Sequence, residues 1–201
     1  MKTAPLFVTV ALEGSADVPI VERLLKDVGL EMGRVYVQGG KARLDRQLRG
    51  YNNAARFGHW LVVRDLDQDA ACAPELKGLL IPEPSTLMCL RVAVRAAESW
   101  LLADAARLAA FLGVSAARVP GDPDQVPDPK GTIINLARHS RKRDVREDMV
   151  PRPGSSARVG PGYATRIMEF AGRDWRPRTA VGNSPSLAGC VAALKRWKKR
   201  A

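Results

Sequence analysis

The stretch Leu61-Val62-Val63-Arg64-Asp65-Leu66-Asp67-Gln68-Asp69 decides how the rest of the chain can be interpreted. Its apolar first part, rich in aliphatic and β-branched residues, is typical of a buried strand. If the extended backbone continues past Arg64, the aspartates at every second position share one face. Three like charges at this distance repel one another and favour protonation unless a cation lies among them. The stretch therefore predicts either a set of hard oxygen ligands for Mg²⁺ or Mn²⁺, or an acidic turn in water.

Strand and helix patterns alternate on both sides of this stretch. Strands are expected at residues 5–12, 34–38, 60–64 and 86–94, and the intervening helices at residues 15–28, 41–57 and 73–80. Alternation of this kind predicts an α/β fold with a mainly parallel sheet flanked by helices. In open α/β sheets, ligands bind beyond the carboxyl ends of the strands. Glu13 closes the first strand and the aspartates close the third, so we expect them at the same edge of the sheet if those two strands are near neighbours.

Two further acidic residues follow strands closely. Asp17 lies near the start of the first helix, for which Ser15 is the expected N-cap, and the helix dipole alone would favour an acid there. Glu98 lies at the junction between the fourth strand and a helix expected to run from about residue 95 to 112. It is either a further metal ligand or an ordinary first-turn glutamate. Asp104, deeper in that helix, is expected to be a surface residue or a salt-bridge partner.

The charge of the chain is unevenly distributed. Residues 1–129 carry 15 Lys and Arg against 16 Asp and Glu, whereas residues 130–201 carry 17 against 5. A Pro- and Asp-rich connector at residues 113–129 coincides with this change. We therefore expect an α/β domain over residues 1–112 and a basic, mostly helical C-terminal appendage over residues 130–201. Strong positive charge beside an acidic site suits a polyanionic partner.

The composition indicates the class of protein and its compartment. The 201 residues are enough to bury a core. The three cysteines are far apart and odd in number, which gives neither a disulfide framework nor a zinc pattern and favours a reducing cytoplasm. The apolar run at residues 6–12 is interpreted as a buried strand rather than a signal peptide. No segment is long enough to span a membrane, so no membrane partner is expected.

The order of three motifs resembles a known family. Glu13-Gly14, Asp65-Leu66-Asp67-Gln68-Asp69 and Ala97-Glu98-Ser99-Trp100 follow one another as in the Toprim domain. More narrowly, they resemble small Toprim-like proteins of the DUF4276 type, which are related to the OLD and RloB nucleases. The resemblance covers roughly residues 5–112 and implies a Toprim- or Rossmann-like sheet.

The resemblance also implies which residues carry the activity. Glu13, Asp65 and Asp67 would be the catalytic residues and would hold Mg²⁺ or Mn²⁺ for phosphodiester cleavage or transfer. Asp17 and Asp69 would be additional metal ligands, followed by Glu98. The expected function is a metal-dependent nuclease or related phosphoryl-transfer enzyme acting on nucleic acid, DNA rather than RNA, in phage defence or DNA repair. The chain lacks the ATPase of OLD-type proteins, so an activating ATPase would be a separate polypeptide.

Basic residues of the C-terminal part are the candidates for binding phosphate groups. Lys130 begins the appendage and Arg158 lies in its Gly-rich loop, where either could add positive charge to a transition state. A charge-dense run supplies three more candidates: Arg141, Lys142 and Arg143.

Two other functions fit parts of the pattern. One is a non-catalytic subunit of the same shape that binds nucleic acid or a partner protein. The other is a different enzyme with an Asp-x-Asp motif, either a HAD-like phosphatase or a nucleotide-sugar transferase. A HAD-like enzyme would carry that motif on its first strand, and a transferase would leave Glu13 without a role.

Overall fold

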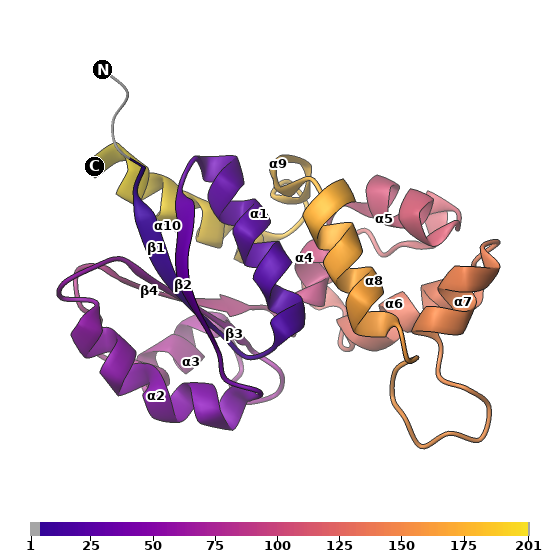
Figure 1. The fold of residues 1–201 in the computed structure, drawn as a ribbon, viewed down its shortest axis with the longest axis horizontal. Helices are drawn as coiled ribbons and strands as arrows, with labels where there is room; N and C mark the ends of the chain where they lie inside the picture. The colour runs from indigo at the N-terminus through magenta and orange to yellow at the C-terminus, as the bar shows by residue number, and fades with distance from the viewer. Residues whose placement is uncertain (1–4, 201) are drawn as a thin grey trace.

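A four-stranded, all-parallel sheet forms the centre of the molecule. The computed structural model describes residues 5–200, and its strand order is β2-β1-β3-β4 (Figure 1). The predicted α/β fold with a parallel sheet flanked by helices is thereby confirmed. The strands are β1 (Phe7–Leu12), β2 (Glu31–Val37), β3 (Trp60–Asp65) and β4 (Met88–Ala93).

The two central strands are mostly apolar and buried. Most side chains of β1 and β3 are completely or almost completely buried, which fits the near-continuous apolar runs of a sheet covered on both faces. β1 pairs with both β2 and β3, and Ala11 lies beside Val62. This register brings the carboxyl ends of β1 and β3 next to each other. Glu13, the residue after β1, and Asp65, the last residue of β3, are therefore neighbours in space.

One face of the sheet is covered by α1 (Val18–Val28) and α10 (Pro185–Arg200), which also pack against each other. The apolar stripe of α1 is buried as its spacing predicts, and the helix ends at Gly29 with a left-handed φ of 75°. The predicted N-cap at Ser15 is wrong. A 3₁₀ turn (Ser15–Asp17) precedes α1, and the Asp17 carboxylate accepts the amide N–H of Gly14 at 3.0 Å.

The opposite face is covered by α2 (Lys41–Ala54) and α3 (Ala73–Leu80). Leu44, Leu48 and Tyr51 of α2 form a second apolar cluster with side chains of β3 and β4. The α2 helix begins directly after Gly39 and Gly40, which both have positive φ values of 72° and 134°. Its first turn consequently lies at the same edge of the sheet as Glu13.

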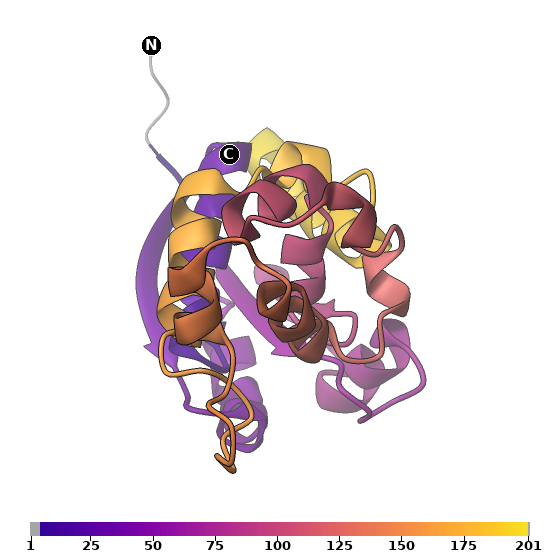
Figure 2. The same ribbon diagram turned by 90° about the vertical axis from the view of Figure 1, so that its right-hand side faces the viewer.

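The C-terminal half is mostly helical, as predicted (Figure 2). Its elements before α10 are α4 (Glu98–Leu102), α5 (Ala105–Leu112), α6 (Pro129–Arg138), α7 (Arg143–Met149), α8 (Tyr163–Glu169), a π-helical turn (Phe170–Asp174) and α9 (Pro177–Ala180). Short 3₁₀ turns occupy Ala116–Arg118 and Pro123–Gln125 within the predicted connector. The loop at residues 151–162 is the lowest part of the molecule in Figures 1 and 2.

The single helix predicted for residues 95–112 is wrong, because the chain breaks at Asp104. The φ and ψ angles of Asp104 are −98° and 63°, outside the helical region. Its buried carboxylate accepts hydrogen bonds from the Arg176 amide and guanidinium at 2.6–3.0 Å. The salt-bridge role expected for Asp104 is thus confirmed, although the residue is 1% exposed and not on the surface.

The two halves share one hydrophobic core. Trp100 of α4 and Trp175 after the π-helical turn are completely buried, and the Trp175 indole donates to the Trp100 carbonyl at 3.0 Å. The cap of α10 is Ser184, whose hydroxyl accepts the Leu187 amide at 3.2 Å, and α10 packs against β4. No helix within residues 5–200 is long and apolar enough to cross a membrane.

Candidate active site

Glu13 and Asp65 meet at the carboxyl end of the sheet. The amide N–H of Asp65 donates to Glu13 Oε1 at 2.8 Å. The first and third strands are neighbours, so the condition of the prediction is met and their ends lie together. The same Glu13 oxygen lies 3.5 Å from the Arg64 guanidinium.

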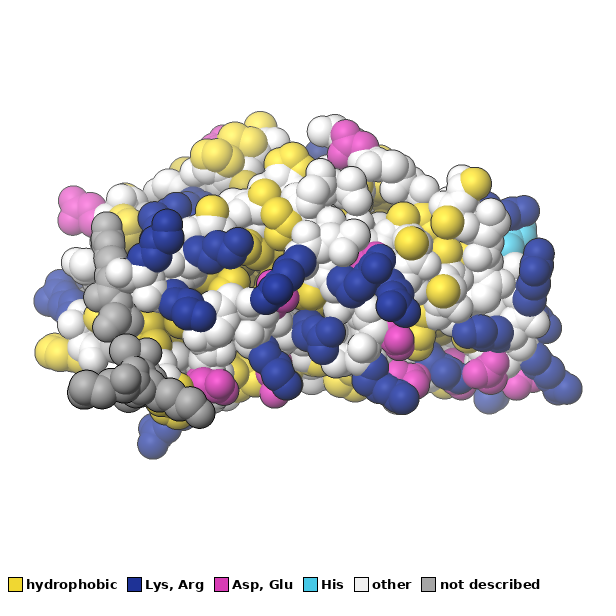
Figure 3. All heavy atoms as spheres, turned by 90° about the horizontal axis from the view of Figure 1, so that it is seen from above, with side chains coloured by type: hydrophobic (Ala, Val, Ile, Leu, Met, Phe, Trp, Pro, Cys, Tyr) yellow, Lys and Arg dark blue, Asp and Glu magenta, His cyan; other side chains and the backbone are white. Residues whose placement is uncertain are grey.

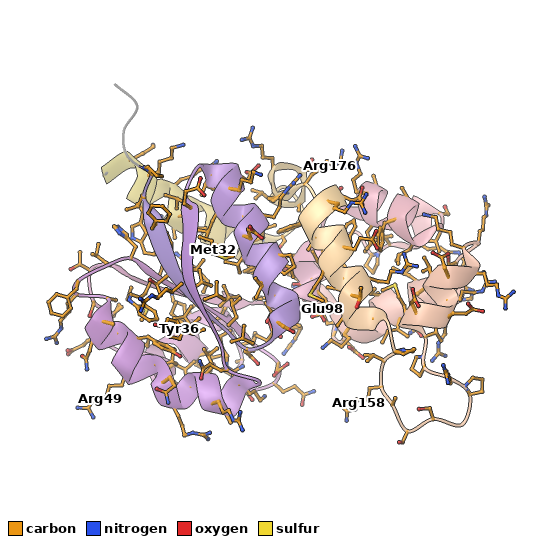
Figure 4. All side chains as sticks on the ribbon, in the orientation of Figure 1. Met32, Tyr36, Arg49, Glu98, Arg158 and Arg176 are labelled. Atoms are coloured by element: carbon orange, nitrogen blue, oxygen red, sulfur yellow. The ribbon has the colours of Figure 1, made fainter. Side chains whose placement is uncertain are left out.

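Asp17 and Glu98 complete an acidic cluster, defined here as Glu13, Asp17, Asp65 and Glu98. Asp17 comes from the turn after β1, and Glu98 is the first residue of α4, beyond the end of β4. Asp65 Oδ1 accepts the amide N–H of Ala97 at 2.9 Å, which fixes Asp65 beside the start of α4. Figure 4 shows Glu98 between α1 and α8, where the two halves meet. Four separate segments thus bring carboxylates to one place.

The environment of the cluster disfavours negative charge. Burial raises the pKa of Asp65 well above its ordinary value, and the charges of Asp17, Glu98 and Glu13 raise it further. Burial also raises the pKa of Asp17 to about 6, against the opposing effect of its bond from Gly14. The pKa of Glu13 is raised by burial, although the Asp65 amide and Arg64 partly offset this. A cation at the cluster would relieve the repulsion.

Asp67 and Asp69 do not point the same way as Asp65, so the prediction of three aspartates on one face is wrong. The strand ends at Asp65, and Asp67 has a φ of 48°, which turns the backbone. Lys41 Nζ binds Asp67 Oδ2 and both Asp69 carboxylate oxygens at 2.9 Å. Hydrogen bonds from Lys41 and Arg64 lower the pKa of Asp69. These two aspartates are therefore paired with cations.

Arg64 is a site residue that the sequence pattern did not identify. Its side chain is 2% exposed and donates to both Asp45 carboxylate oxygens at 3.0 and 3.1 Å and to Asp69 at 2.5 Å. It also donates to the Asp65 carbonyl. Long charged side chains are almost never buried without a partner. An arginine inside an apolar strand could therefore have indicated a buried ion pair at Arg64. Arg64 braces the end of β3 against α2.

Lys130 and Tyr163 bring the C-terminal half to the acidic cluster. Lys130 Nζ lies 3.4 Å from Glu98 Oε1, and the Tyr163 hydroxyl donates to the same oxygen at 3.3 Å. Burial and the Glu98 charge raise the pKa of Tyr163. The sequence marks Tyr163 only as the first residue of a helix. Its contact with Glu98 depends on how the helices pack, and no local sequence pattern predicts it.

A cleft of about 900 Å³ opens beside the cluster. Positive side chains from both halves line it, together with Asp65, Asp67, Asp69 and Asp128. The four cations are Lys41, Arg95, Lys130 and Arg158. Figure 4 shows Arg158 on the 151–162 loop. Carboxylates and cations therefore line the cleft together, and its cations could contact the phosphate groups of a ligand.

The basic run Arg141, Lys142 and Arg143 lies elsewhere and does not line this cleft. Lys142 Nζ donates to the carbonyls of Ala110 and Phe111 at the end of α5, at 3.1 and 2.8 Å. Arg143 pairs with Glu147 on its own helix. On the face that Figure 3 shows, Lys and Arg side chains are spread over the surface with fewer Asp and Glu among them. Positive charge is therefore not confined to the cleft.

The chemistry of the cluster fits a hard divalent cation. Its donors are all carboxylate oxygens, the ligands that Mg²⁺ and Mn²⁺ prefer. Within residues 5–200, no group of three or more His, Cys, Asp or Glu side chains is already arranged to hold a metal ion. No buried side-chain oxygen in that part of the chain lacks a partner, so carboxylate oxygens without a hydrogen bond face solvent. The oxygen donors of the cluster therefore fit Mg²⁺ or Mn²⁺, and binding of such an ion would draw the carboxylates together.

Comparison of the chain with protein-family models finds no match, and neither the curated proteins nor the solved structures include one.

Proposed function

We propose that this protein is a Mg²⁺- or Mn²⁺-dependent nuclease, or a related phosphodiester phosphoryl-transfer enzyme of Toprim type. The observation that supports it is the acidic cluster, in which carboxylates from four segments meet at the carboxyl edge of a parallel sheet, beside a cleft lined by four cations and four carboxylates. Carboxylates gathered there at a cost in charge repulsion are typical of functional sites. The substrate is nucleic acid, DNA rather than RNA, and the setting is phage defence or DNA repair in the cytoplasm.

Glu13, Asp17, Asp65 and Glu98 would hold the metal. When bound, the ion would polarise a phosphate oxygen and lower the pKa of a bound water. The protein fixes Glu13 through the Asp65 amide and fixes Asp65 through the Ala97 amide, so the ligands are oriented by main-chain hydrogen bonds. Asp67 and Asp69 stay paired with Lys41, and all three residues line the cleft.

The cations that line the cleft would bind the phosphate backbone. Lys41, Arg95 and Arg158 come from different elements and line the same cleft as Asp65. Residues 130–201 add a large excess of positive charge, with 17 Lys and Arg against 5 Asp and Glu. Contacts to phosphates release counterions, so binding should weaken steeply with salt and depend little on base sequence.

Plasmid nicking tests the proposal directly. Supercoiled DNA is incubated with Mg²⁺ or Mn²⁺ and with the wild-type protein, Asp65→Asn or Asp144→Asn. We expect Asp65→Asn to reduce nicking by about 100-fold or more, a loss typical of a residue at the reacting centre. Asp144→Asn is the matched control, because it makes the same change at an exposed position on α7. Equal nicking by wild type and Asp65→Asn would contradict the proposal.

A binding subunit without catalysis is the second candidate. The observation that favours it is that the cluster carboxylates already have protein partners and form no group arranged to hold a metal within residues 5–200. Tight, salt-dependent binding to DNA would then be unchanged by metal and by Asp65→Asn. The same three proteins in a filter-binding assay distinguish this candidate from the nuclease.

A further inference from the structure

Lys130 reaches the acidic cluster from the other half of the molecule. It lies in the first turn of α6, where the Asp128 carboxylate caps the helix by accepting the Gly131 amide at 2.8 Å. The inner face of α6 packs against α4, and Ile133 is completely buried. The backbone of Lys130 is therefore held in place next to the helix that begins with Glu98.

The side chain of Lys130 is much less constrained than its backbone. It is 51% exposed, and its ion pair to Glu98 spans 3.4 Å. Its four-carbon stem allows the ammonium group to move by several ångströms without moving the helix. Lys130 also lines the cleft, so its ammonium can face either the carboxylates or a ligand in the cleft.

The charge of Lys130 acts on most of the cluster. Glu98 has the largest effect in raising the pKa of Lys130, and Asp65 and Asp17 raise it further. Arg64 is the cation nearest to Glu13, but it is buried and tied to Asp45 and Asp69. Lys130 is therefore the cation beside Glu98 that is free to leave.

We propose that Lys130 is a tethered counter-ion of the acidic cluster, which competes with the divalent cation and is released toward the substrate phosphate when the metal binds. This inference rests on the proposed function, since it takes the cluster to be the metal site. It adds that Lys130 regulates metal binding at that site. In the free protein Lys130 weakens metal binding, and in the loaded protein the same group increases affinity for the polyanion.

Metal affinity alone tests this competition. Mn²⁺ is titrated into the full-length chain at pH 8, and free Mn²⁺ is followed by electron paramagnetic resonance for wild type, Lys130→Met, Lys130→Arg and Arg158→Met. We expect Lys130→Met to bind Mn²⁺ about tenfold more tightly, the size expected for removing a unit charge a few ångströms from a divalent ion in a wet site. Lys130→Arg should bind like wild type.

Arg158→Met is the matched control. It removes one positive charge from the same cleft, but Arg158 has no carboxylate partner within residues 5–200. Its Mn²⁺ affinity should stay within about twofold of wild type, because exposed charges at a distance are screened.

In the nicking assay at saturating Mn²⁺, Lys130→Met should be at least tenfold slower than wild type despite its tighter metal binding.

The outcomes separate this inference from the proposed function. If wild type binds Mn²⁺ and Lys130→Met binds it no more tightly, or if Arg158→Met gains as much, the competition is overturned and the metal site stands. If no variant binds Mn²⁺, the proposed function fails together with the inference. Circular dichroism confirms that each variant is folded, and Lys130→Gln repeats the test should the methionine variant be misfolded.

Discussion

Asp17 occupies a position where the folded protein disfavours its charge. Its pKa is raised from 3.8 to about 6 by burial and by the neighbouring Glu98 and Glu13. Between these two pH values the folded state binds more protons than the unfolded state, so stability falls as pH rises through this window. Above about pH 6 the full loss of stability that comes from ionising Asp17 is present. The acidic cluster therefore costs stability at neutral pH, as functional sites often do.

Replacing Asp17 by Asn should stabilise the protein at pH 8. The amide oxygen can still accept the Gly14 N–H, while the unfavourable charge is gone. The gain in unfolding free energy should reach up to about 3 kcal/mol at pH 8, the equivalent of the pKa shift, and should be near zero below pH 4. Urea unfolding at several pH values measures it. The exposed Asp122→Asn is the control, and an equal gain there at pH 8 would contradict this account.

Divalent cations should raise the melting temperature of wild type but not of Asp65→Asn. A ligand that binds only the folded state at 100 times its dissociation constant adds about 2.7 kcal/mol. Because metal must displace protons from Asp65 and Asp17, whose pKa values are raised, the stabilisation should grow between pH 6 and pH 8. Thermal melts with and without Mg²⁺ test this. Equal stabilisation of both proteins would show that the metal binds elsewhere.

At the scale of elements, the sequence predicted strands better than their ends. The apolar runs of β1, β3 and β4 and the stripe of α1 follow simple periodicity, and their elements were found within a few residues. The meeting of Glu13 and Asp65 was predicted on the condition that their strands are near neighbours, and the sheet order meets that condition. Asp67 was misplaced because the left-handed turn after Asp65 has no Gly or Asn to mark it. Tyr163, Lys130 and Arg64 meet their partners through tertiary packing, which periodicity does not encode.

The junction of α4 and α5 should depend strongly on Asp104. Replacing this buried carboxylate by alanine removes three hydrogen bonds to Arg176 and should cost about 2–4 kcal/mol of unfolding free energy. Asp27→Ala is the matched control, since Asp27 pairs with the exposed Arg178 at the surface and should cost about 0–1 kcal/mol. Urea denaturation of both variants gives the comparison. Equal losses would mean that the Asp104 contact does not hold the junction.

At the scale of the whole molecule, the acidic cluster depends on both halves. Lys130 and Tyr163 contact Glu98 from α6 and α8, and α10 covers β4 after the chain has passed through all the other helices. The predicted division at residues 113–129 therefore runs through a shared core and a shared site. The excess positive charge of residues 130–201 is attached to the acidic edge by packing rather than by a flexible linker.

A fragment of residues 1–112 should consequently not fold cooperatively by itself. It lacks α10 and Trp175, and so leaves the apolar side of β4 and the surface of Trp100 exposed to water. We expect a low melting cooperativity and binding of a hydrophobic dye, measured against the full-length chain. A sharp two-state transition close to that of the full-length protein would contradict the shared core.

The position of the bound metal tests the central claim most directly. Crystals soaked in Mn²⁺ should show an anomalous peak at the acidic cluster, in contact with Asp65 and Glu13 and beside Glu98, with Lys130 moved away from Glu98. A peak only at Asp67 and Asp69, or none at the sheet edge at a Mn²⁺ concentration that supports nicking, would contradict it.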